Sequence, residues 1–468
     1  MKISVIGAGY VGLTTAACLA EIGHMVCCAD SDEQKLSLLR SGQMPFFEPY
    51  LNEIVSRNCI SGKLRFETTE IAVAGAEAIF ICVGTPPLEN GDADLSAVAN
   101  VARTIGQIAT GACLVIEKST VPVQTGQQLT RQLQLYASKG LKCDVVSNPE
   151  FLREGSAIHD FFHPERIVTG VEREAAAARV KEIYRPILEQ TFNCPIHPHC
   201  AHGQKPAWIV TDVSSAELIK HASNSFLAMK ISFINMVADL CEVVGADVTK
   251  VALGMGMDPR IGPAFLSAGI GFGGFCFPKD VQAFTRIAEK SGCDFSLLKE
   301  VEKVNQRRIG RFLEKVRNEL WVIRGTKVAV LGLAFKPNTD DVRFAPSIEL
   351  VRALTREGAR VSAYDPQAIQ KAKAVLPDIE YSPNPYEAAR GAEAVMIMTE
   401  WEEFRKLDWG KLRGIVERPL VIDGRNMFEP GEITSHGFQY ISTGRPAACV
   451  FDESMRTAAT QQPSAVLT

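Results

Sequence analysis

The chain has 468 residues, 46% of them hydrophobic and 22% charged, which is typical of a globular protein with two or three domains. Lys and Arg number 50 against 54 Asp and Glu, so the charge balance gives no reason to expect nucleic acid as a partner. No apolar run approaches the roughly 20 residues of a membrane helix, and we expect no membrane contact. The 13 cysteines show no disulfide spacing. Because no signal peptide is recognisable either, we expect free thiols and a cytoplasmic location.

The first residues carry a nucleotide-binding pattern. A strand predicted at residues 2–6 runs into Gly7-Ala8-Gly9-Tyr10-Val11-Gly12, an apolar helix pattern spans 13–22, and a second strand at 25–29 ends on Asp30. In this order the glycines bring backbone amides to a pyrophosphate at the helix N-terminus, and the acid binds the ribose. Asp30 favours NAD over NADP. A glycine turn without a ligand is the plain alternative, and FAD, which shares the fingerprint, is the stronger competitor.

Three further apolar strands each end in a polar loop marked by proline. They are Ala78–Val83 before Gly84-Thr85-Pro86-Pro87, Cys113–Glu117 before Lys118-Ser119-Thr120-Val121-Pro122, and Val145–Ser147 before Asn148-Pro149-Glu150. Any one of these loops alone is best interpreted as a turn. Because ligands of open parallel sheets bind beyond the carboxyl ends of the strands, the three together predict a shared site at the nucleotide.

Residues 191–208 differ in composition from the rest of the chain. They hold five residues of the types that bind zinc: Cys194, His197, His199, Cys200 and His202. Their spacing matches no standard ligand pairing, and the prolines among them are typical of a surface loop. We therefore predict no bound metal, with a zinc site as the alternative.

A long helix is predicted from about Thr211 to Val244, because apolar residues recur there at helical spacing. Ser214-x-x-Glu217 resembles a capping box at its start. The helix is long enough to serve as a spine and as a dimer surface. Lys220 and Asn224 stand four residues apart and so share one face, where they either meet solvent or line a pocket.

The next notable stretch is the glycine-rich loop Gly271–Asp280, which contains Cys276 and a Lys279-Asp280 pair. With a helix predicted at 281–290, Cys276 would precede a helix N-terminus. The helix dipole and a nearby cation lower the pKa of a thiol and suit it to nucleophilic attack. The plain alternative is a buried cysteine in an ordinary turn.

A second α/β unit is predicted from about Gly325, with a strand at 327–332, a helix at 347–357 and a strand at 360–364 that ends on Asp365. Strands at 394–398 and 420–422 complete the sheet. The first turn, Gly332–Lys336, lacks the glycine fingerprint, which favours a different nucleotide ligand. The fold class is thus α/β, with two Rossmann-like doubly wound domains joined by a long central helix.

Three motifs, Asn148–Gly155, Glu217–Lys220 and Gly273–Asp280, together resemble the UDP-glucose/GDP-mannose dehydrogenase family. The resemblance extends from the glycine fingerprint to Asp423-Gly424-Arg425-Asn426. It implies a homodimer or higher homo-oligomer and three domains: an NAD-binding domain at 1–205, a central helical dimerisation domain with the cysteine loop at 206–310, and a UDP-binding domain at 320–450. The tail at 451–468 is expected to be disordered because its residues, from about Thr457, are polar and small.

The resemblance is closest to the members that oxidise UDP-glucose. It implies a four-electron oxidation to UDP-glucuronate, for polysaccharide biosynthesis, with two NAD⁺ and a thiohemiacetal and thioester on a cysteine. GDP-mannose or an N-acetylated UDP-hexosamine is the alternative substrate. A two-electron hydroxyacid dehydrogenase and a catalytically silent nucleotide sensor are the alternative functions.

The resemblance also assigns roles to residues. Cys276 is implied as the nucleophile, Lys220 as acid/base or oxyanion partner, Asn224 and Asp280 as positioning groups, and Glu150 as the base for thioester hydrolysis. The implied NAD contacts are Gly7, Gly9, Tyr10, Val11, Gly12, Asp30, Lys35, Thr85, Thr120, Glu154, Lys279 and Arg343. The implied substrate contacts are Phe151, Leu152, Arg153, Glu154, Lys220, Asn224, Arg260, Phe265, Leu266, Ser267, Ala268, Gly269, Gly271, Phe335, Lys336 and Arg425.

Cations are the side chains that a diphosphate requires, and Arg260, Lys336 and Arg425 supply them; the resemblance implies that Arg260 reaches a neighbouring subunit's site. Two features depart from the family pattern. Phe275 precedes the nucleophile where serine is usual, so we expect an altered sugar pocket. Residues 191–208 resemble an insertion ahead of the long helix.

Overall fold

The computed structural model describes residues 1–138, 140–197 and 205–448. The predicted tail from 451 onward and His199, Cys200 and His202 lie outside these residues. The chain divides into a first unit, Met1–Phe226 with Cys276–Lys299, and a second unit, Leu227–Phe275 with the chain from Glu300 onward. Within the described residues, no helix combines the length and the apolarity that crossing a membrane requires.

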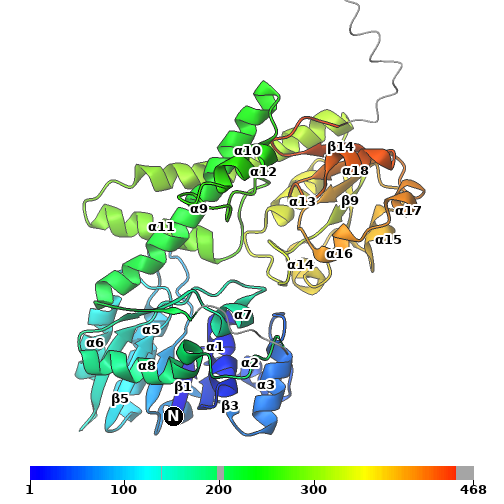
Figure 1. The fold of residues 1–468 in the computed structure, drawn as a ribbon. Helices are drawn as coiled ribbons and strands as arrows, with labels where there is room; N and C mark the ends of the chain where they lie inside the picture. The colour runs from blue at the N-terminus through cyan, green and yellow to red at the C-terminus, as the bar shows by residue number, and fades with distance from the viewer. Residues whose placement is uncertain (139, 198–204, 449–468) are drawn as a thin grey trace, which may run out of the picture. The chain divides into compact units, whose positions relative to one another are not determined.

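The first unit is built on an eight-stranded sheet of order β3-β2-β1-β4-β5-β6-β7-β8 (Figure 1). Its strands pair in parallel except at the single β6–β7 contact. The first six strands follow the 3-2-1-4-5-6 order of dinucleotide-binding folds. The strands are β1 (Lys2–Ile6), β2 (Met25–Ala29), β3 (Leu64–Glu67), β4 (Ala78–Ile81), β5 (Ala112–Glu117), β6 (Lys142–Ser147), β7 (Arg166–Gly170) and β8 (Ala207–Thr211).

Helices cover both faces of this sheet, as the near-continuous apolar character of its strands predicts. Along β1, Ile3 and Val5 enter one core cluster with α1, α3 and α8, whereas Ile6 enters a second cluster with α4, α5 and α6. The helices of this unit are α1 (Tyr10–Glu21), α2 (Glu33–Arg40), α3 (Leu51–Ile60), α4 (Thr69–Val73), α5 (Ser96–Ile108), α6 (Thr125–Leu135), α7 (Ala157–Phe162), α8 (Glu174–Glu189) and α11 (Cys276–Lys290).

The second unit holds a six-stranded parallel sheet of order β11-β10-β9-β12-β13-β14, again 3-2-1-4-5-6. The prediction of two doubly wound domains is therefore confirmed. Its strands are β9 (Lys327–Leu331), β10 (Arg360–Tyr364), β11 (Glu380–Tyr381), β12 (Ala394–Ile397), β13 (Leu420–Asp423) and β14 (Gln439–Ser442). Its helices are α10 (Val248–Gly256), α12 (Ser296–Leu320), which starts in the first unit, α13 (Pro346–Arg356), α14 (Ile369–Val375), α15 (Pro385–Ala389), α16 (Glu402–Arg405), α17 (Trp409–Arg413) and α18 (Pro430–Ser435).

The long helix α9 (Val213–Val244) starts in the first unit and continues into the second. Its predicted capping box is wrong. Asp212 caps the helix instead, because its Oδ1 accepts the Ser215 N–H at 2.8 Å. The Glu217 carboxylate accepts the N–H groups of Gln124 (2.6 Å) and Gly126 (2.7 Å) at the start of α6. Glu217 therefore joins two helices that are distant in sequence.

The carboxyl group of Glu117, at the end of β5, is buried. Its Oε1 accepts the Ser119 N–H at 2.9 Å, and among the described residues its Oε2 has no hydrogen-bond partner. Loss of hydration raises the pKa of Glu117 to about 8. Because the pKa of Glu117 is higher in the folded than in the unfolded chain, protonation of Glu117 stabilises the folded state. This contribution to the unfolding free energy is complete below about pH 4.5 and is lost as the pH rises through about 8.

Replacing Glu117 with Gln removes this titration. We expect the Tm difference between Glu117→Gln and the wild type to increase in favour of the variant between pH 5 and pH 9. The corresponding difference in unfolding free energy should grow by up to ~1.4 kcal/mol per pH unit. Thermal unfolding across this range measures it, with the exposed Glu174→Gln as matched control. A Tm difference that stays constant with pH would contradict the assignment.

Candidate active site

The β1–α1 turn requires glycine for two different reasons. Gly7 has φ +103°, and a Cβ there would lie 2.5 Å from the Cys82 carbonyl oxygen. A Cβ on Gly12 would lie 1.7 Å from the Gly7 oxygen. At Gly9, in contrast, a Cβ would meet no atom within 4 Å. The turn is thus tightly packed at Gly7 and Gly12 and open at Gly9, in front of the α1 N-terminus. A pyrophosphate site requires this combination.

The Asp30 carboxylate lies directly against this turn. It accepts the Ala8 N–H at 2.8 Å and the Asp32 N–H at 3.0 Å, and it pairs with the Lys35 ammonium at 2.8 Å. Burial by itself raises the pKa of Asp30, but the hydrogen bonds from Lys35, Asp32 and Ala8 outweigh it and hold the pKa below its usual value. Asp30 is therefore an anion at neutral pH. On the neighbouring loops, the Thr85 hydroxyl donates to the Thr120 carbonyl at 2.8 Å.

A buried ion pair forms the centre of the predicted catalytic group. Lys220 Nζ, on α9, lies 2.8 Å from Glu150 Oε1, in the loop after β6, and the two side chains are 4% and 5% exposed. Glu150 Oε2 accepts the Leu152 N–H at 2.6 Å. Burial lowers the pKa of Lys220, but the negative charges of Glu150 and Asp280, together with the hydrogen bond to Glu150, outweigh it and raise the pKa above its usual value. Lys220 is a cation suited to stabilising an oxyanion.

A second pair of polar groups adjoins this centre. Asn224 Nδ2, one turn after Lys220 on α9, donates to Asp280 Oδ2 at 2.6 Å, and Asp280 pairs with Lys279 at 2.6 Å. Burial raises the pKa of Asp280, but the charges of Lys279, Lys220 and His221 outweigh it and hold the pKa below its usual value. The side chain of Asn224 is thereby fixed by an anion.

The helix after the cysteine loop starts earlier than predicted. It begins at Cys276 rather than Val281, so Cys276 and Asp280 are four residues apart on one face of α11. The charges of Glu150, Asp280, Lys220 and Glu154 all act on the Cys276 sulfur. The first unit thus brings together the five residues to which the resemblance assigns catalytic roles.

The prediction that the pKa of Cys276 is lowered is wrong. Part of its side chain meets solvent, yet protein atoms surround the sulfur closely enough for loss of hydration to raise the pKa of the thiol to about 12. The carboxylates of Glu150 and Asp280 also raise it, and Lys220 opposes them without prevailing. Cys276 therefore rests as a thiol at neutral pH.

Sequence reasoning missed Glu48, which holds the Glu150 loop in place. Its carboxylate accepts the N–H groups of Gly155 (2.6 Å) and Ala157 (2.7 Å) and the hydroxyl proton of Tyr10. The Tyr10 hydroxyl in turn accepts the Gly155 N–H at 2.8 Å. Glu48 lies outside every motif, and only contacts between distant segments reveal its role. It ties the Glu150 loop and the start of α7 to the nucleotide-binding turn.

Four of the substrate contacts implied for the first unit, residues 151–154, lie in the same loop, and the other two, Lys220 and Asn224, lie on α9. The Phe151 ring stands 3.9 Å from the Arg166 guanidinium and 5.5 Å from Lys220 Nζ. Arg153 forms a two-pronged ion pair with Asp160, with distances of 2.9 and 2.6 Å. The charge of Arg153 is thus already compensated by α7.

The substrate contacts implied for the second unit gather at the carboxyl edge of its sheet. The Arg425 guanidinium donates to the carbonyl oxygens of Phe335 (2.7 Å) and Gly271 (3.2 Å). A Cβ on Gly269 would lie 2.6 Å from the Gly424 oxygen, and one on Gly274 would lie 2.7 Å from the Phe335 ring. The loop from Phe265 to Gly274 is therefore glycine-rich because it packs closely against this edge. Leu266 and Ala268 are buried beneath the loop.

Of the other implied residues of the second unit, Arg260 lies apart from this packing, whereas Arg343 and Lys336 lie beside it. The Arg260 side chain is 88% exposed and pairs with Asp258 at 2.6 Å. Arg343 pairs with Asp341 at 2.6 Å, and its guanidinium stands 4.6 Å from the Phe275 ring. The Lys336 ammonium lies 5.3 Å from the Phe335 ring. Phe275, the residue that departs from the family pattern, thus contacts an arginine.

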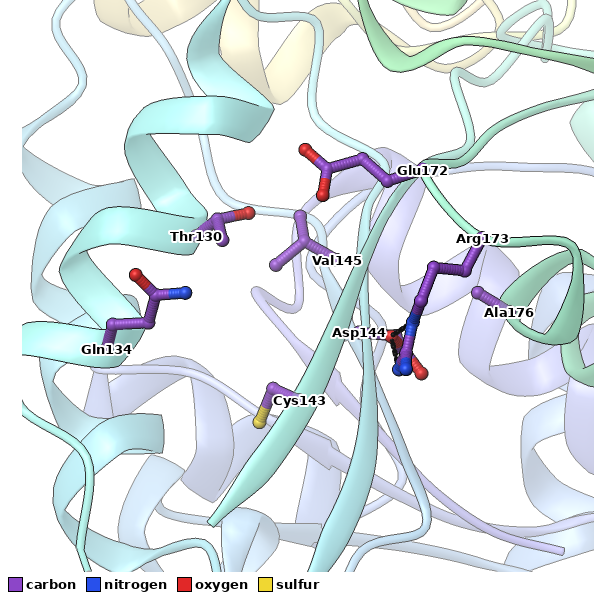
Figure 2. A pocket seen from close by; sticks show the side chains of 8 residues that line it. All are labelled: Thr130, Gln134, Cys143, Asp144, Val145, Glu172, Arg173 and Ala176. Atoms are coloured by element: carbon purple, nitrogen blue, oxygen red, sulfur yellow. Dashed lines mark hydrogen bonds and ion pairs between the residues drawn. The ribbon is translucent and has the colours of Figure 1, made fainter.

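A hollow of about 290 Å³ opens elsewhere in the first unit, between α6, β6 and the start of α8. Figure 2 shows Thr130 and Gln134 on α6 facing it, with Arg173 turned toward Asp144. Its lining includes none of the catalytic or binding residues predicted from the sequence. This hollow is therefore a surface depression away from the candidate site.

Comparison with known proteins decides the family. The UDP-glucose/GDP-mannose dehydrogenase models match as NAD binding domain (residues 1–188), central domain (214–307) and UDP binding domain (329–430). The chain belongs to this family. As a member of the UDP-glucose/GDP-mannose dehydrogenases it carries an NAD domain, which confirms NAD as the cofactor, and a UDP domain, which supports a nucleotide-sugar substrate.

Similar members of the family cover nearly the whole chain. The UDP-glucose 6-dehydrogenase of Rhizobium meliloti is 46% identical over 451 residues, 95% of this chain and all of the relative. UDP-glucose 6-dehydrogenase TuaD of Bacillus subtilis is 45% identical over 450 residues, covering 95% and 94%. The structure of a UDP-glucose dehydrogenase from the archaeon Pyrobaculum islandicum matches with a TM-score of 0.85 and 39% identity, covering 95% and 98%.

The Asp30 carboxylate gives this family member a testable cofactor preference. Replacing it with Ala removes the acceptor for the ribose hydroxyls and leaves Lys35 without its anion. We expect NADH to bind at least about tenfold more weakly and the ratio of NADH to NADPH affinity to fall, because Lys35 then attracts a 2′-phosphate. Titration calorimetry with both dinucleotides measures this, with Asp32→Asn as control. An unchanged affinity ratio would exclude Asp30 as the selective group.

Proposed function

We propose that the protein oxidises UDP-glucose to UDP-glucuronate with two NAD⁺, through covalent intermediates on Cys276. The observation that carries this proposal is the convergence of one thiol, one buried cation and two carboxylates in the first unit. A two-electron dehydrogenase has no use for the thiol. The names of the relatives, UDP-glucose 6-dehydrogenases, favour UDP-glucose among nucleotide sugars.

The first oxidation converts the primary alcohol of the sugar to an aldehyde. Bound NAD⁺ accepts the two electrons and one hydrogen of each oxidation as hydride. The hydroxyl proton of the sugar passes to solvent, and Lys220 stabilises the negative charge that develops on the sugar oxygen. The Asn224 amide, fixed by Asp280, orients this oxygen. The buried Glu150–Lys220 contact keeps the ammonium in position.

The second half of the reaction uses the thiol. The Cys276 sulfur forms a bond to the aldehyde carbon while the carbonyl oxygen gains a proton, which gives a thiohemiacetal. In the second oxidation the thiohemiacetal loses its C–H hydrogen as hydride and its hydroxyl proton to solvent, and the product is a thioester on Cys276. Water then adds to this carbonyl, Glu150 accepts a proton of the water, and the C–S bond breaks to release the carboxylate and restore the thiol.

NADH stoichiometry across a panel of sugars tests the proposal. We expect two NADH per UDP-glucose, and far lower turnover of GDP-mannose and of N-acetylated UDP-hexosamines. About one NADH per sugar would exclude the thioester route, and equal or better turnover of another sugar would reassign the substrate. No NADH with any of these sugars would leave a nucleotide sensor as the function.

We also propose that the enzyme works in the cytoplasm and supplies UDP-glucuronate for polysaccharides.

We further propose that two copies of the chain associate through α9. In the second unit α9 carries an exposed apolar stripe at helical spacing, formed by Phe233, Met236, Leu240 and Val243. Leu240 and Val243 are 61% and 82% exposed, and such a stripe is best covered by an identical helix.

A charge in this stripe tests the association. We expect Leu240→Glu to convert a dimer into a monomer, because a carboxylate buried between two identical helices would lie next to its own copy. Light scattering after size exclusion measures the mass, with Lys303→Glu on exposed α12 as control. A wild-type protein that is monomeric at all concentrations would refute the proposal.

A further inference from the structure

Three ligand-type side chains meet in the first unit, away from the candidate active site. They are His163, directly after α7, and Cys194 and His197, in the segment after α8. One ligand atom from each lies within 4.8 Å of the other two. His163 Nε2 is 3.3 Å from Cys194 Sγ, which is 3.6 Å from His197 Nδ1.

These distances fit the edges of a zinc coordination tetrahedron. With a Zn–S bond of about 2.3 Å and Zn–N bonds of about 2.05 Å, the tetrahedral angle places S and N about 3.5 Å apart. A hydrogen-bonded Cys–His pair explains one such distance. With the second imidazole, three ligand atoms from three side chains lie within 4.8 Å of one another, as the ligands of one ion do.

A backbone donor also lies against the Cys194 sulfur. The His197 backbone N–H donates to it at 3.4 Å across the Cys-x-x-His turn. An N–H donor stabilises a thiolate over a thiol. Three positions apart in such a turn, a cysteine and a histidine can bind the same ion.

A second histidine pair completes the pattern. His159 precedes His163 by one helical turn, and its ring stands 5.3 Å from that of His163 and 5.9 Å from that of His197. His-x3-His on one segment is an ordinary zinc spacing, and Cys-x2-His on the other segment adds two more ligand types within one turn. The pattern is not apparent in the sequence because its halves are 31 residues apart, whereas residues 191–208 alone show no standard pairing.

Packing fixes the two segments against each other. The rings of Phe162 and Phe192 stack at 5.2 Å, and the His163 ring lies 5.8 Å from Phe192. Cys194 and Ile196 pack against the first core cluster. The ligand atoms are therefore held together by the fold before any ion binds, which lowers the entropy cost of binding.

We propose that His163, Cys194 and His197 bind one Zn²⁺ ion, with the fourth position filled by His159 or water. On binding, the Cys194 thiol loses its proton to solvent as the Zn–S bond forms. The ion joins the end of α7 to the segment after α8. Since α7 also carries Asp160, the partner of Arg153, the metal stabilises the helix that supports the Glu150 loop. This proposal differs from the prediction made from the sequence, which was that no metal is bound.

Metal analysis of tag-free protein tests this site. We expect about one Zn²⁺ per chain by mass spectrometry of the metal, and, after chelation and Co²⁺ loading, a thiolate-to-cobalt charge-transfer band with the strong ligand-field bands of tetrahedral cobalt. Cys194→Ala should abolish the charge-transfer band, and Cys194→Ala and His197→Ala should each weaken metal binding at least about 100-fold. The exposed thiol variant Cys293→Ala should retain both.

Folding of the variants is followed separately by circular dichroism and NADH binding. Wild-type protein that takes up no stoichiometric Zn²⁺ or Co²⁺ would overturn the proposal. So would a charge-transfer band that persists in Cys194→Ala, since the thiolate would then come from another cysteine. Loss of binding in His159→Ala assigns the fourth ligand to that histidine, and unchanged binding assigns it to water.

Discussion

Cys276→Ala is expected to lower the rate of UDP-glucuronate formation by at least about a thousandfold, because no other thiol of the catalytic group can hold the aldehyde as a thiohemiacetal. Binding of UDP-glucose should change little, since the thiol contributes to the reaction rather than to nucleotide recognition. Steady-state NADH formation and product analysis measure the rate. Cys293→Ala, an exposed thiol in the same unit, serves as the control.

The raised pKa of the Cys276 thiol adds a pH signature. Alkylation by iodoacetamide proceeds through the thiolate. With the pKa of the thiol at about 12, the rate at Cys276 should rise about tenfold per pH unit between pH 7 and 9, without a plateau. A plateau near pH 7 would show a thiolate at rest, and full turnover of Cys276→Ala would remove the residue from the mechanism.

The second large effect is expected at the buried Lys220–Glu150 pair. Lys220→Met leaves two buried carboxylates, Glu150 and Asp280, without their shared cation, and should cost about 3–5 kcal/mol of unfolding free energy. The double variant Lys220→Met/Glu150→Gln removes the isolated charge and should recover much of this loss. Both variants should lack activity, because neither supplies a cation to the sugar oxygen.

Urea denaturation and NADH formation, measured on the same samples, separate the two effects. Lys290→Met breaks an exposed ion pair with Asp92 and should change stability by less than about 1 kcal/mol. If the double variant recovers activity along with stability, Lys220 acts through structure alone. If Lys220→Met unfolds no more easily than Lys290→Met, the pair contributes nothing to stability.

Local patterns in the sequence were sufficient to predict most of the fold. The GxGxxG turn, its flanking strands and the terminal Asp30 lie within 30 residues, and such short-range order specifies one βαβ unit almost completely. Lys220 and Asn224 were placed on one helix face by spacing alone. These predictions needed only the periodicity of helix and strand, together with turn chemistry.

Features that depend on distant contacts were missed. Glu217 was assigned to a capping box, but its carboxylate reaches α6, about 90 positions earlier in the chain. The pKa of Cys276 follows from hydration and from the charges of several segments summed at one sulfur. His163 shows no relation to Cys194 until α7 and the segment after α8 pack together. No local sequence pattern encodes contacts between distant segments or the electrostatic effects that add up at one atom.

The hydrogen bonds that Glu48 accepts from Gly155 and Ala157 affect how inactivating substitutions should be interpreted. Random mutagenesis scored only by product formation would place Glu48 beside Glu150 in importance, although the two are 102 positions apart in the sequence. A loss of loop structure caused by a substitution at Glu48 would then be mistaken for the loss of a catalytic group. Assays that separate loop order from turnover, such as proteolysis near Gly155, distinguish a support residue from a reacting one.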